Sequence, residues 1–302
     1  MSGNRGSYVV WRTYGAGFWS IIGTTLSHLK IAEEMGLVPV VDFANYPTIY
    51  NESHPVGDKS NMWEYYFDQP AGRSVEEIEP TAFVCDGKIP KRYRGDLTEP
   101  FFGEQWRSRV KIRTDIKRRI ENNIEQMELS SRTLGVHLRG QEARRAKGHM
   151  FPATMHQFNE AIAFALDQGD FTSILLVSEA QQYIDFALRK WGDKIDIRIS
   201  PTFRLRFRDS YRLRHSPRPN HRFELGFEAL QDAYLLAQCG GIVRGHSGIS
   251  DAASMLRSQP FEPFIQISQG RNSLRPYIAA WIWYAKATAP HSIGGFDRWR
   301  PS

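Results

Sequence analysis

The sequence predicts an α/β protein of two domains, in which parallel β-sheets are covered by helices. Strand-like and helix-like segments alternate along the chain, which is typical of βαβ units. The 302 residues are about twice the length of a usual single domain, so two domains are expected. With 41% hydrophobic and 24% charged residues, the chain can bury a substantial core, which argues against disorder or a fibrous protein.

The first βαβ unit is predicted close to the amino terminus. Residues 8–12 (YVVWR) form a strand candidate, followed by the turn Gly15-Ala16-Gly17. Apolar residues then recur every three or four positions over residues 18–35, which predicts a helix, and Gly36 is a typical residue after a helix end. Residues 37–43 (LVPVVDF) predict a second buried strand. The glycine turn therefore lies at the carboxyl end of the first strand.

The segment from residue 45 to about residue 103 is irregular and rich in aromatic residues. The clearest strand in it covers residues 81–85. The aromatic residues between Tyr46 and Phe67 have two interpretations: they contact a sugar acceptor by stacking, or they fill the core of the first domain. A long basic helix is then predicted over residues 104–128.

Regular alternation resumes in the second half, and we place the domain boundary near Ser130-Ser131. The two predicted domains are residues 1–130 and 131–302, and we leave open that the final helix packs back on the first domain. Strands are predicted at residues 133–138, 171–177, 195–199, 241–243 and 264–267, and helices at residues 154–166, 181–191, 223–238, from near Gly248, and at 274–287.

Positive charge is concentrated in two runs, although the formal net charge is only +6. Residues 107–119 carry seven basic residues against Asp115, and apolar residues recur among them, as on a helix with a solvated basic face. Residues 204–222 carry seven arginines against Asp209, and Pro217 and Pro219 predict an irregular loop. Such a loop can contact an anionic acceptor or an anionic membrane, or it can be an ordinary surface loop.

Several classes of enzyme lose support because their motifs are missing. The sequence has no GxxxxGK[ST] loop, no HExxH, no paired CxxC, no GxSxG and no Asp-x-Asp. We therefore expect no metal site. Two cysteines, no recognisable leader and no apolar stretch of about 20 residues lead us to expect a soluble cytoplasmic protein.

Three segments follow predicted strands and can bind an anion there. The turn before Phe18 opens a helix, although Ser20 replaces the third glycine of the dinucleotide fingerprint. After the strand at 133–138, His137 and Arg139 share one face, where the guanidinium can hold a diphosphate or pair with a carboxylate. In the segment from Arg244 to Gly248, Ser247 is placed to cap a helix that can also receive a phosphate.

All three of these segments take part in a family resemblance. The run His137-Leu138-Arg139-x-x-Glu142 resembles the His-x-Arg-x-x-Asp motif of the α1,6- and protein O-fucosyltransferases, a group that includes nodulation fucosyltransferases. Residues 230–239, followed by Ile242-Val243 and Ser247, are similar to the second motif of that group. The turn at residues 15–17 is similar to its amino-terminal loop that faces the diphosphate.

The resemblance implies a GT-B fold, with two Rossmann-like domains facing a central cleft. It implies an inverting, metal-independent glycosyltransferase that moves fucose from GDP-fucose to a hydroxyl of a glycan acceptor, such as a bacterial surface polysaccharide or lipo-oligosaccharide. GDP-fucose would be the donor substrate, and no cofactor is implied. The donor would bind mainly to the second domain.

Matched positions assign roles to individual residues. Arg139 would hold the β-phosphate, His137 would lie beside the nucleotide, and Asp232 would accept hydrogen bonds from guanine. Candidate bases are Glu142, His149 and Asp42; Lys147 departs from the family because a further acidic residue is usual near it. The complete set of predicted site residues is Arg139, Glu142 and His149 for catalysis, and Gly15, Gly17, Phe18, His137, Arg139, Asp232, His246, Ser247 and Gly248 for binding the nucleotide sugar.

Other functions remain open at this point. A different GDP-sugar fits the same motifs, because they mainly recognise the nucleotide. A non-catalytic module that binds nucleotide sugars or glycans is also compatible with Lys147. Nucleic-acid binding has less support, because the basic runs carry no recognised reading motif and no interleaved aromatic residues.

Overall fold

The computed structural model describes residues 5–93, 100–139, 142–204 and 218–300. It forms two compact units, Met1–Asn123 with Arg212–Gln231, and Ile124–Tyr211 with Asp232–Ser302. The sequence-based boundary near Ser130-Ser131 treats each domain as one continuous stretch, whereas the described residues 218–231 return to the first unit. Helix α8 (His221–Ala237) thus contributes residues to both units.

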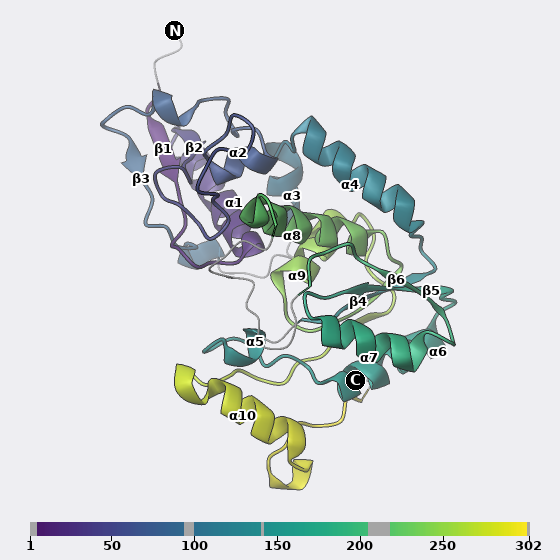
Figure 1. Cartoon of the computed structure of the whole chain (residues 1–302). Helices are drawn as coiled ribbons and strands as arrows, with labels where there is room; N and C mark the ends of the chain where they lie inside the picture. Colours follow the sequence, from purple (N-terminus) through teal and green to yellow (C-terminus); the bar gives the residue numbers. More distant parts are fainter. Residues whose placement is uncertain (1–4, 94–99, 140–141, 205–217, 301–302) are drawn as a thin grey trace. The chain divides into compact units, whose positions relative to one another are not determined.

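The first unit contains the predicted βαβ unit. Strands β1 (Ser7–Val10), β2 (Val38–Val41) and β3 (Phe83–Val84) form a parallel sheet in the order β2-β1-β3. Helix α1 (Phe18–Glu34) connects β1 to β2 and packs on both strands (Figure 1). Gly15 has φ +92°, a conformation that favours glycine, so the turn after β1 depends on this residue.

The aromatic residues between β2 and β3 belong to the core of the first unit. Helix α2 (Met62–Tyr66) buries most of them, and the Phe18 ring meets the Tyr66 ring edge-on at 5.2 Å. Tyr66 stacks on Phe223, with ring centroids 5.5 Å apart. The core interpretation of this segment is therefore right for the buried members, which are Tyr50, Trp63, Tyr65, Tyr66 and Phe67.

The prediction of one long basic helix over residues 104–128 is wrong. Two helices occupy the region, α3 (Pro100–Arg109) and α4 (Thr114–Met127). Between them the backbone pairs with the segment after α2: Asp68 donates its N–H to Lys111 O, and Arg113 donates to Tyr66 O, both at 2.9 Å. These long-range hydrogen bonds replace helical ones, which a local charge and hydrophobic pattern cannot indicate.

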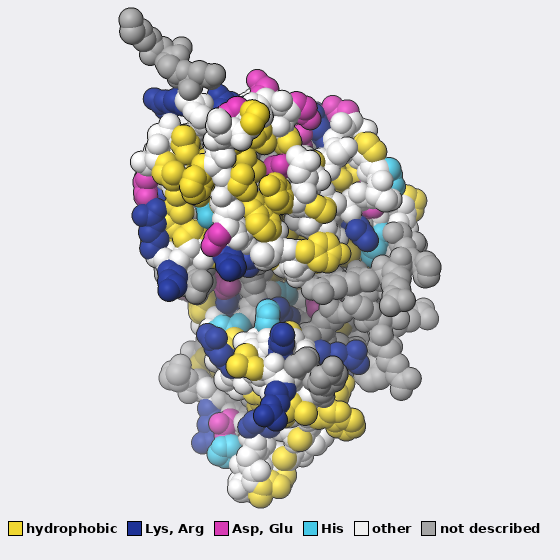
Figure 2. Space-filling view, turned by 90° about the vertical axis from the view of Figure 1, so that its left-hand side faces the viewer, with side chains coloured by type: hydrophobic (Ala, Val, Ile, Leu, Met, Phe, Trp, Pro, Cys, Tyr) yellow, Lys and Arg dark blue, Asp and Glu magenta, His cyan; other side chains and the backbone are white. Residues whose placement is uncertain are grey.

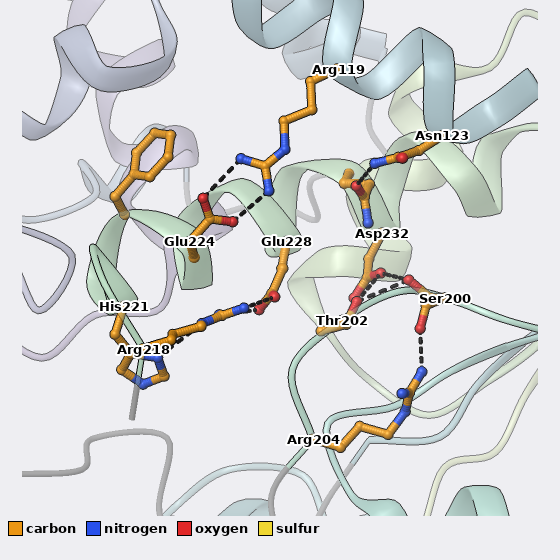
Figure 3. A network of polar contacts seen from close by, with 12 residues as sticks. Arg119, Asn123, Ser200, Thr202, Arg204, Arg218, His221, Glu224, Glu228 and Asp232 are labelled. Atoms are coloured by element: carbon orange, nitrogen blue, oxygen red, sulfur yellow. Dashed lines mark hydrogen bonds and ion pairs between the residues drawn. The ribbon is translucent and has the colours of Figure 1, made fainter. Parts of the chain in front are cut away.

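Many of the basic side chains in this region are paired. Arg109 lies 2.7 Å from Glu33, and Lys111 lies 2.6 Å from Asp68. Arg119 holds Glu224 through both guanidinium nitrogens (Figure 3). These residues therefore form a partly neutralised surface of the first unit.

The second unit is built on a five-stranded parallel sheet in the order β6-β5-β4-β7-β8. Its strands are β4 (Thr133–His137), β5 (Ser173–Val177), β6 (Asp196–Ile199), β7 (Gly241–Arg244) and β8 (Phe264–Gln266). Its longer helices are α6 (Met155–Gln168), α7 (Gln181–Trp191), α9 (Gly248–Leu256) and α10 (Pro276–Thr288), besides the end of α8.

Helices cover both faces of this sheet (Figure 1). On one face, α6 and α7 pack against alternate residues of β4 and β5, including Leu134 and Ile174. On the other face, α8 and α9 pack against Leu175 and Ile242. Because both faces are covered, every residue of the inner strands β4, β5 and β7 is buried, and these strands are rich in apolar residues. The α/β class with parallel sheets is confirmed.

The remaining elements are short, apart from the final helix. Helix α5 (Glu142–Arg145) follows β4, and three 3₁₀ turns cover Val75–Glu77, Lys91–Tyr93 and His291–Ile293. Helix α10 belongs to the second unit, where Trp283 donates its indole N–H to Pro152 O at 2.8 Å. Within the part of the chain that the structure describes, no helix has the length and apolar character to cross a bilayer.

Candidate functional site

The order of strands in the second unit points to one edge of its sheet. The chain goes from β4 to β5 and β6 on one side, and then returns to β7 and β8 on the other side of β4. Parallel α/β sheets bind ligands beyond the carboxyl ends of the strands where this order reverses. His137 ends β4 and Arg244 ends β7, and the two residues are direct partners in the strand register.

A hollow of about 290 Å³ lies at this edge. It brings together five of the residues that the sequence singled out, which come from the β4–α5 region and from the start of α9. These are Arg139, His149, His246, Ser247 and Gly248; Gly148, Met150, Asp251 and Arg271 complete the lining.

Arg139 is positioned by the loop that precedes α9. Its Nη1 donates a hydrogen bond to the carbonyl oxygen of His246 at 2.7 Å. The side chain is half-buried, so part of the guanidinium remains open to solvent beside the hollow. This arrangement brings a permanent positive charge to the beginning of a helix.

The start of α9 has the geometry of an anion site. Ser247 is the N-cap residue, and its hydroxyl accepts a hydrogen bond from Ile249 N at 3.4 Å, as the sequence predicted. A helix amino terminus carries unpaired N–H groups and a partial positive charge. A Cβ atom at Gly245 would meet no atom within 4 Å, so the loop before the helix is open.

Two buried nitrogens beneath this edge lack a hydrogen-bond partner among the described residues: Nδ1 of His137 and Nη1 of Arg244. Arg244 is only 1% exposed; it donates to Gly245 O at 3.2 Å and forms an ion pair with Asp251 in the first turn of α9. Burying a polar group without a partner costs about 1–3 kcal/mol. These two nitrogens are therefore candidates for contact with a ligand or a water molecule.

Sequence reasoning did not give Arg244 a role. The available signal was weak: an arginine that ends a short apolar strand and precedes glycine. Its importance depends on the register with His137 and on burial, and both are properties of the folded sheet.

The environment of His137 keeps its ring neutral. Burial lowers its pKa to about 3, and the positive charges of Arg139 and Arg244 act in the same direction. An anion bound beside these three residues would offset the charges of the two guanidinium groups.

The buried state of His137 predicts a pH-dependent stability. The unfolded chain takes up a proton near pH 6.5, whereas the folded chain does not until about pH 3. The free energy of unfolding should therefore fall as pH decreases through this window, by up to about 1.4 kcal/mol per pH unit from this group. In urea unfolding at pH 7, 6 and 5, His137→Gln should flatten the slope and exposed His54→Gln should not. Equal slopes in all three proteins would contradict the assignment.

Asp232 lies on α8, and its carboxylate meets the residues that follow β6, at the carboxyl end of the sheet. It is 3% exposed, and its carboxylate accepts hydrogen bonds from the hydroxyl groups of Ser200 and Thr202, the latter at 2.7 Å (Figure 3). Ser200 and Thr202 directly follow β6. The residue thus places a buried carboxylate two strands away from β4.

The candidate bases occupy different settings. His149 lines the hollow, and part of its surface is exposed to solvent. Partial burial of the ring, and then the positive charge of Arg139, lower the pKa of His149, so its ring is neutral near pH 7. Glu142 begins α5, and its side chain lies outside the described part of the structure. Asp42 accepts hydrogen bonds from Ala44 N and from both nitrogens of Asn45, so it stabilises the turn after β2.

The predicted residues of the first unit form a separate group. Gly15 and Gly17 shape the turn before α1, and Gly17 is its N-cap residue. Phe18 is buried, and its N–H donates to the hydroxyl of Tyr50 at 2.9 Å. Its side chain therefore supports the core, and this N–H already has a partner inside the unit.

Most of the arginine loop, residues 205–217, lies outside the described residues. The arginines that flank it are engaged within the protein. Arg218 holds the buried Glu228 through two hydrogen bonds of 2.6 and 2.9 Å, and Arg222 donates to Asn51 O at 3.1 Å. Arg204 donates to Ser200 O (Figure 3).

No metal or thiol centre appears near the hollow in the described ranges. Across them, no group of three or more His, Cys, Asp or Glu side chains is arranged to hold a metal ion. Cys85 and Cys239 are both buried and unbridged, and burial raises the pKa of the Cys239 thiol to about 12.

The fold is similar to that of solved fucosyltransferases. NodZ α-1,6-fucosyltransferase, co-crystallised with GDP, matches with a TM-score of 0.57 and 17% identity over 84% of this chain and 93% of the other. The fucosyltransferase NodZ from Bradyrhizobium gives the same TM-score at 18% identity, covering 84% of this chain and 94% of the other. POFUT1 in complex with GDP-fucose has a TM-score of 0.53 at 9% identity, covering 88% of this chain and 99% of the other.

Sequence comparison alone finds no relative. No protein-family profile matches the chain, and no curated protein matches it. The structural likeness shows the fold, and it confirms the expected resemblance and the GT-B fold class.

Proposed function

We propose that this protein is a glycosyltransferase that takes GDP-fucose as donor and transfers the sugar to a hydroxyl of a glycan acceptor. The observation that carries the proposal is the hollow at the start of α9, where Arg139 meets a helix amino terminus above two buried nitrogens that have no hydrogen-bond partner among the described residues. Proteins with the same fold were crystallised with GDP or GDP-fucose, which supports the same class of donor here.

The hollow suits the diphosphate of such a donor. The Arg139 guanidinium lines the hollow together with Ser247 and Gly248, the residues at which α9 begins. A guanidinium group and the N–H groups of a helix amino terminus are donors that phosphate oxygens accept. Negative charge grows on the diphosphate as the bond to the sugar breaks. Positive groups already in place stabilise that charge and lower the barrier.

The guanine base is assigned to Asp232. Neighbouring strands lie about 4.8 Å apart, so β6 and β4 are separated by about 10 Å, a span that suits a nucleoside between its base and its phosphates. Guanine presents two N–H donors on one edge, and a carboxylate accepts both. Adenine lacks that pair of donors, so the carboxylate would select GDP.

The reaction inverts the sugar configuration in this proposal. The acceptor hydroxyl attacks the anomeric carbon, the bond to the diphosphate breaks, and the hydroxyl proton passes to a base. His149 is the base that the geometry supports, because it lines the hollow and its lowered pKa leaves the ring neutral. Glu142 is the alternative carried by the sequence motif. No metal is required in this scheme, because cationic groups of the chain neutralise the leaving diphosphate.

The proposal also covers the acceptor and the cellular compartment. We assign the acceptor to bacterial surface polysaccharides or lipo-oligosaccharides and the protein to the cytoplasm. Buried, unbridged Cys85 and Cys239 are compatible with a reducing compartment.

The decisive experiment is thermal stabilisation by GDP, UDP, ADP and CMP, each with excess EDTA. GDP at about a hundred times its Kd should add about 2.7 kcal/mol to the free energy of unfolding, which raises Tm by several degrees. The other nucleotides should have little effect. Equal shifts with all four, or none with GDP, would refute the assignment of the nucleotide site.

A second candidate function is a non-catalytic protein that binds GDP-sugars. Lys147 supports it, since a cation stands where the resembling family has a further acid. Both candidates predict the GDP shift. Release of GDP from GDP-fucose in the presence of glycan acceptors separates them, because only a transferase produces it at a rate that depends on the acceptor.

A further inference from the structure

Helix α10 is apolar on two opposite sides. One side is buried in the second unit, where Ala279 is 0% and Trp283 is 6% exposed. The other side carries Ile278, Trp281 and Tyr284 at three-residue spacing, and Leu274 directly precedes the helix. The exposed fractions are 80% for Leu274, 39% for Ile278, 75% for Trp281 and 41% for Tyr284; we call these four residues the α10 stripe.

This exposure requires an explanation. Single apolar side chains on a surface are ordinary, but several in a row on one helix usually mark a binding surface. A helix that is apolar all round is normally buried on all sides or in contact with lipid. The buried side already anchors the helix through Trp283, and the Tyr284 hydroxyl accepts a hydrogen bond from Arg144 at 3.3 Å. These contacts leave the large exposed areas of Leu274 and Trp281 unexplained.

Positive charge surrounds the amino-terminal end of the stripe. Arg275 and Arg271 precede α10, and both are exposed. The segment with exposed Arg145 and Lys147 lies beside them, because Gly148 N donates to Ser273 O at 3.0 Å. Figure 2 shows basic side chains beside hydrophobic ones over this part of the second unit.

Negative charge is scarce in the same region. Between residues 264 and 300 the sequence contains one acidic residue, Asp297, and its carboxylate pairs with His291 at 2.6 Å. This stretch of the chain, together with Arg145 and Lys147, is therefore apolar at the stripe and cationic at the amino-terminal end of the stripe. It complements an anionic partner that also offers hydrocarbon.

We propose that the α10 stripe and its rim of Arg145, Lys147, Arg271 and Arg275 form a docking surface for an anionic lipid bilayer. Tryptophan and tyrosine favour the boundary between headgroups and acyl chains, and basic residues near it bind anionic lipid. The 13 residues of α10 are too few to cross the bilayer, so the helix lies along its surface.

A second copy of the chain is a poorer occupant of the surface. Symmetric pairing places the same patch of each copy face to face, so the cationic rims meet and repel each other. A bilayer that contains anionic lipid offers the opposite charge.

Docking here would hold the hollow near the membrane. Arg271 and Gly148 line the hollow as well as adjoining the stripe, all within the second unit. An acceptor carried on a lipid would then meet the site at the bilayer surface. Vesicle binding itself does not depend on the proposed transferase activity.

The test measures co-sedimentation of the full chain with vesicles of phosphatidylcholine alone or mixed equally with phosphatidylglycerol. We expect binding to the mixed vesicles, little to the neutral ones, and weakening with salt. Trp281→Glu and Leu274→Glu should lose most of the binding, while Tyr14→Glu, at a residue 68% exposed in the first unit, should keep it. Arg275→Glu should weaken partition by at least about fivefold, whereas exposed Arg189→Glu should not.

Three results would overturn the proposal. The first is failure of the unmodified protein to bind anionic vesicles. The second is equal binding by Trp281→Glu and the unmodified protein. The third is a dimer in light scattering that Trp281→Glu dissociates, which would assign the stripe to self-association. Thermal stabilisation of Trp281→Glu by GDP should be unchanged, so failure of the docking proposal is distinguishable from failure of the nucleotide assignment.

Discussion

Arg139→Ala is expected to lower kcat/KM for GDP-fucose by about 10²–10³-fold, the usual cost of removing one well-placed donor to a developing negative charge. The fold should be retained, because the hydrogen bond that the structure records for this side chain runs to His246 O, on the half-buried surface of the hollow. The measurements are steady-state transfer rates and GDP affinity, with circular dichroism as a check on folding.

Two further variants sharpen this test. Arg139→Lys keeps the charge and loses the planar pair of donors, so it should recover part of the affinity for GDP and little of kcat. Arg189→Ala removes an exposed arginine of α7 and should behave as the unmodified protein. Normal kinetics in Arg139→Ala would show that the diphosphate binds elsewhere.

Asp232→Asn is expected to lower the preference for GDP over ADP by about 10–100-fold, since a bidentate pairing with a base is worth about 1–3 kcal/mol of discrimination. Asparagine keeps the shape and can still accept from Thr202, so the loss should come from the missing second acceptor. Competition between GDP and ADP at equilibrium measures the ratio directly.

Thr202→Val is the matched control for Asp232→Asn. It removes one hydroxyl that donates to the carboxylate and leaves the carboxylate in place. It should lower the free energy of unfolding by about 1 kcal/mol and keep most of the preference for GDP. If the two variants lose the same selectivity, or if Asp232→Asn loses none, the guanine role of Asp232 is wrong.

Local sequence pattern determined most of the secondary structure. Helix α7 runs from Gln181 to Trp191, as predicted, and β4 and β5 lie within the predicted strands. Hydrophobic period and turn residues act over a few positions, so a short window of sequence contains the information. The pattern also located Arg139 and Ser247 at strand ends, which sufficed to bring them to one edge of the sheet.

Where a long-range contact competes with the local pattern, the sequence alone led to a wrong or an ambiguous prediction. Residues 110–113 have a helical pattern, yet their backbone pairs with residues 66–68, which separates α3 from α4. The aromatic residues from Tyr46 to Phe67 allowed two interpretations, because the sequence does not show which side chains meet a neighbour and which meet solvent. Burial in the first unit decided it.

The sequence by itself therefore determined the α/β class, most of the elements and the fucosyltransferase-like motifs. Only the tertiary structure decided that residues 218–231 join the first unit and that α10 exposes an apolar stripe. It also decided that His137 and Arg244 lie side by side, with buried nitrogens that have no partner within the described residues. The physical reason is the range of the interactions. Periodicity depends on near neighbours, whereas burial, register and the partner of a buried charge depend on residues a hundred or more positions away.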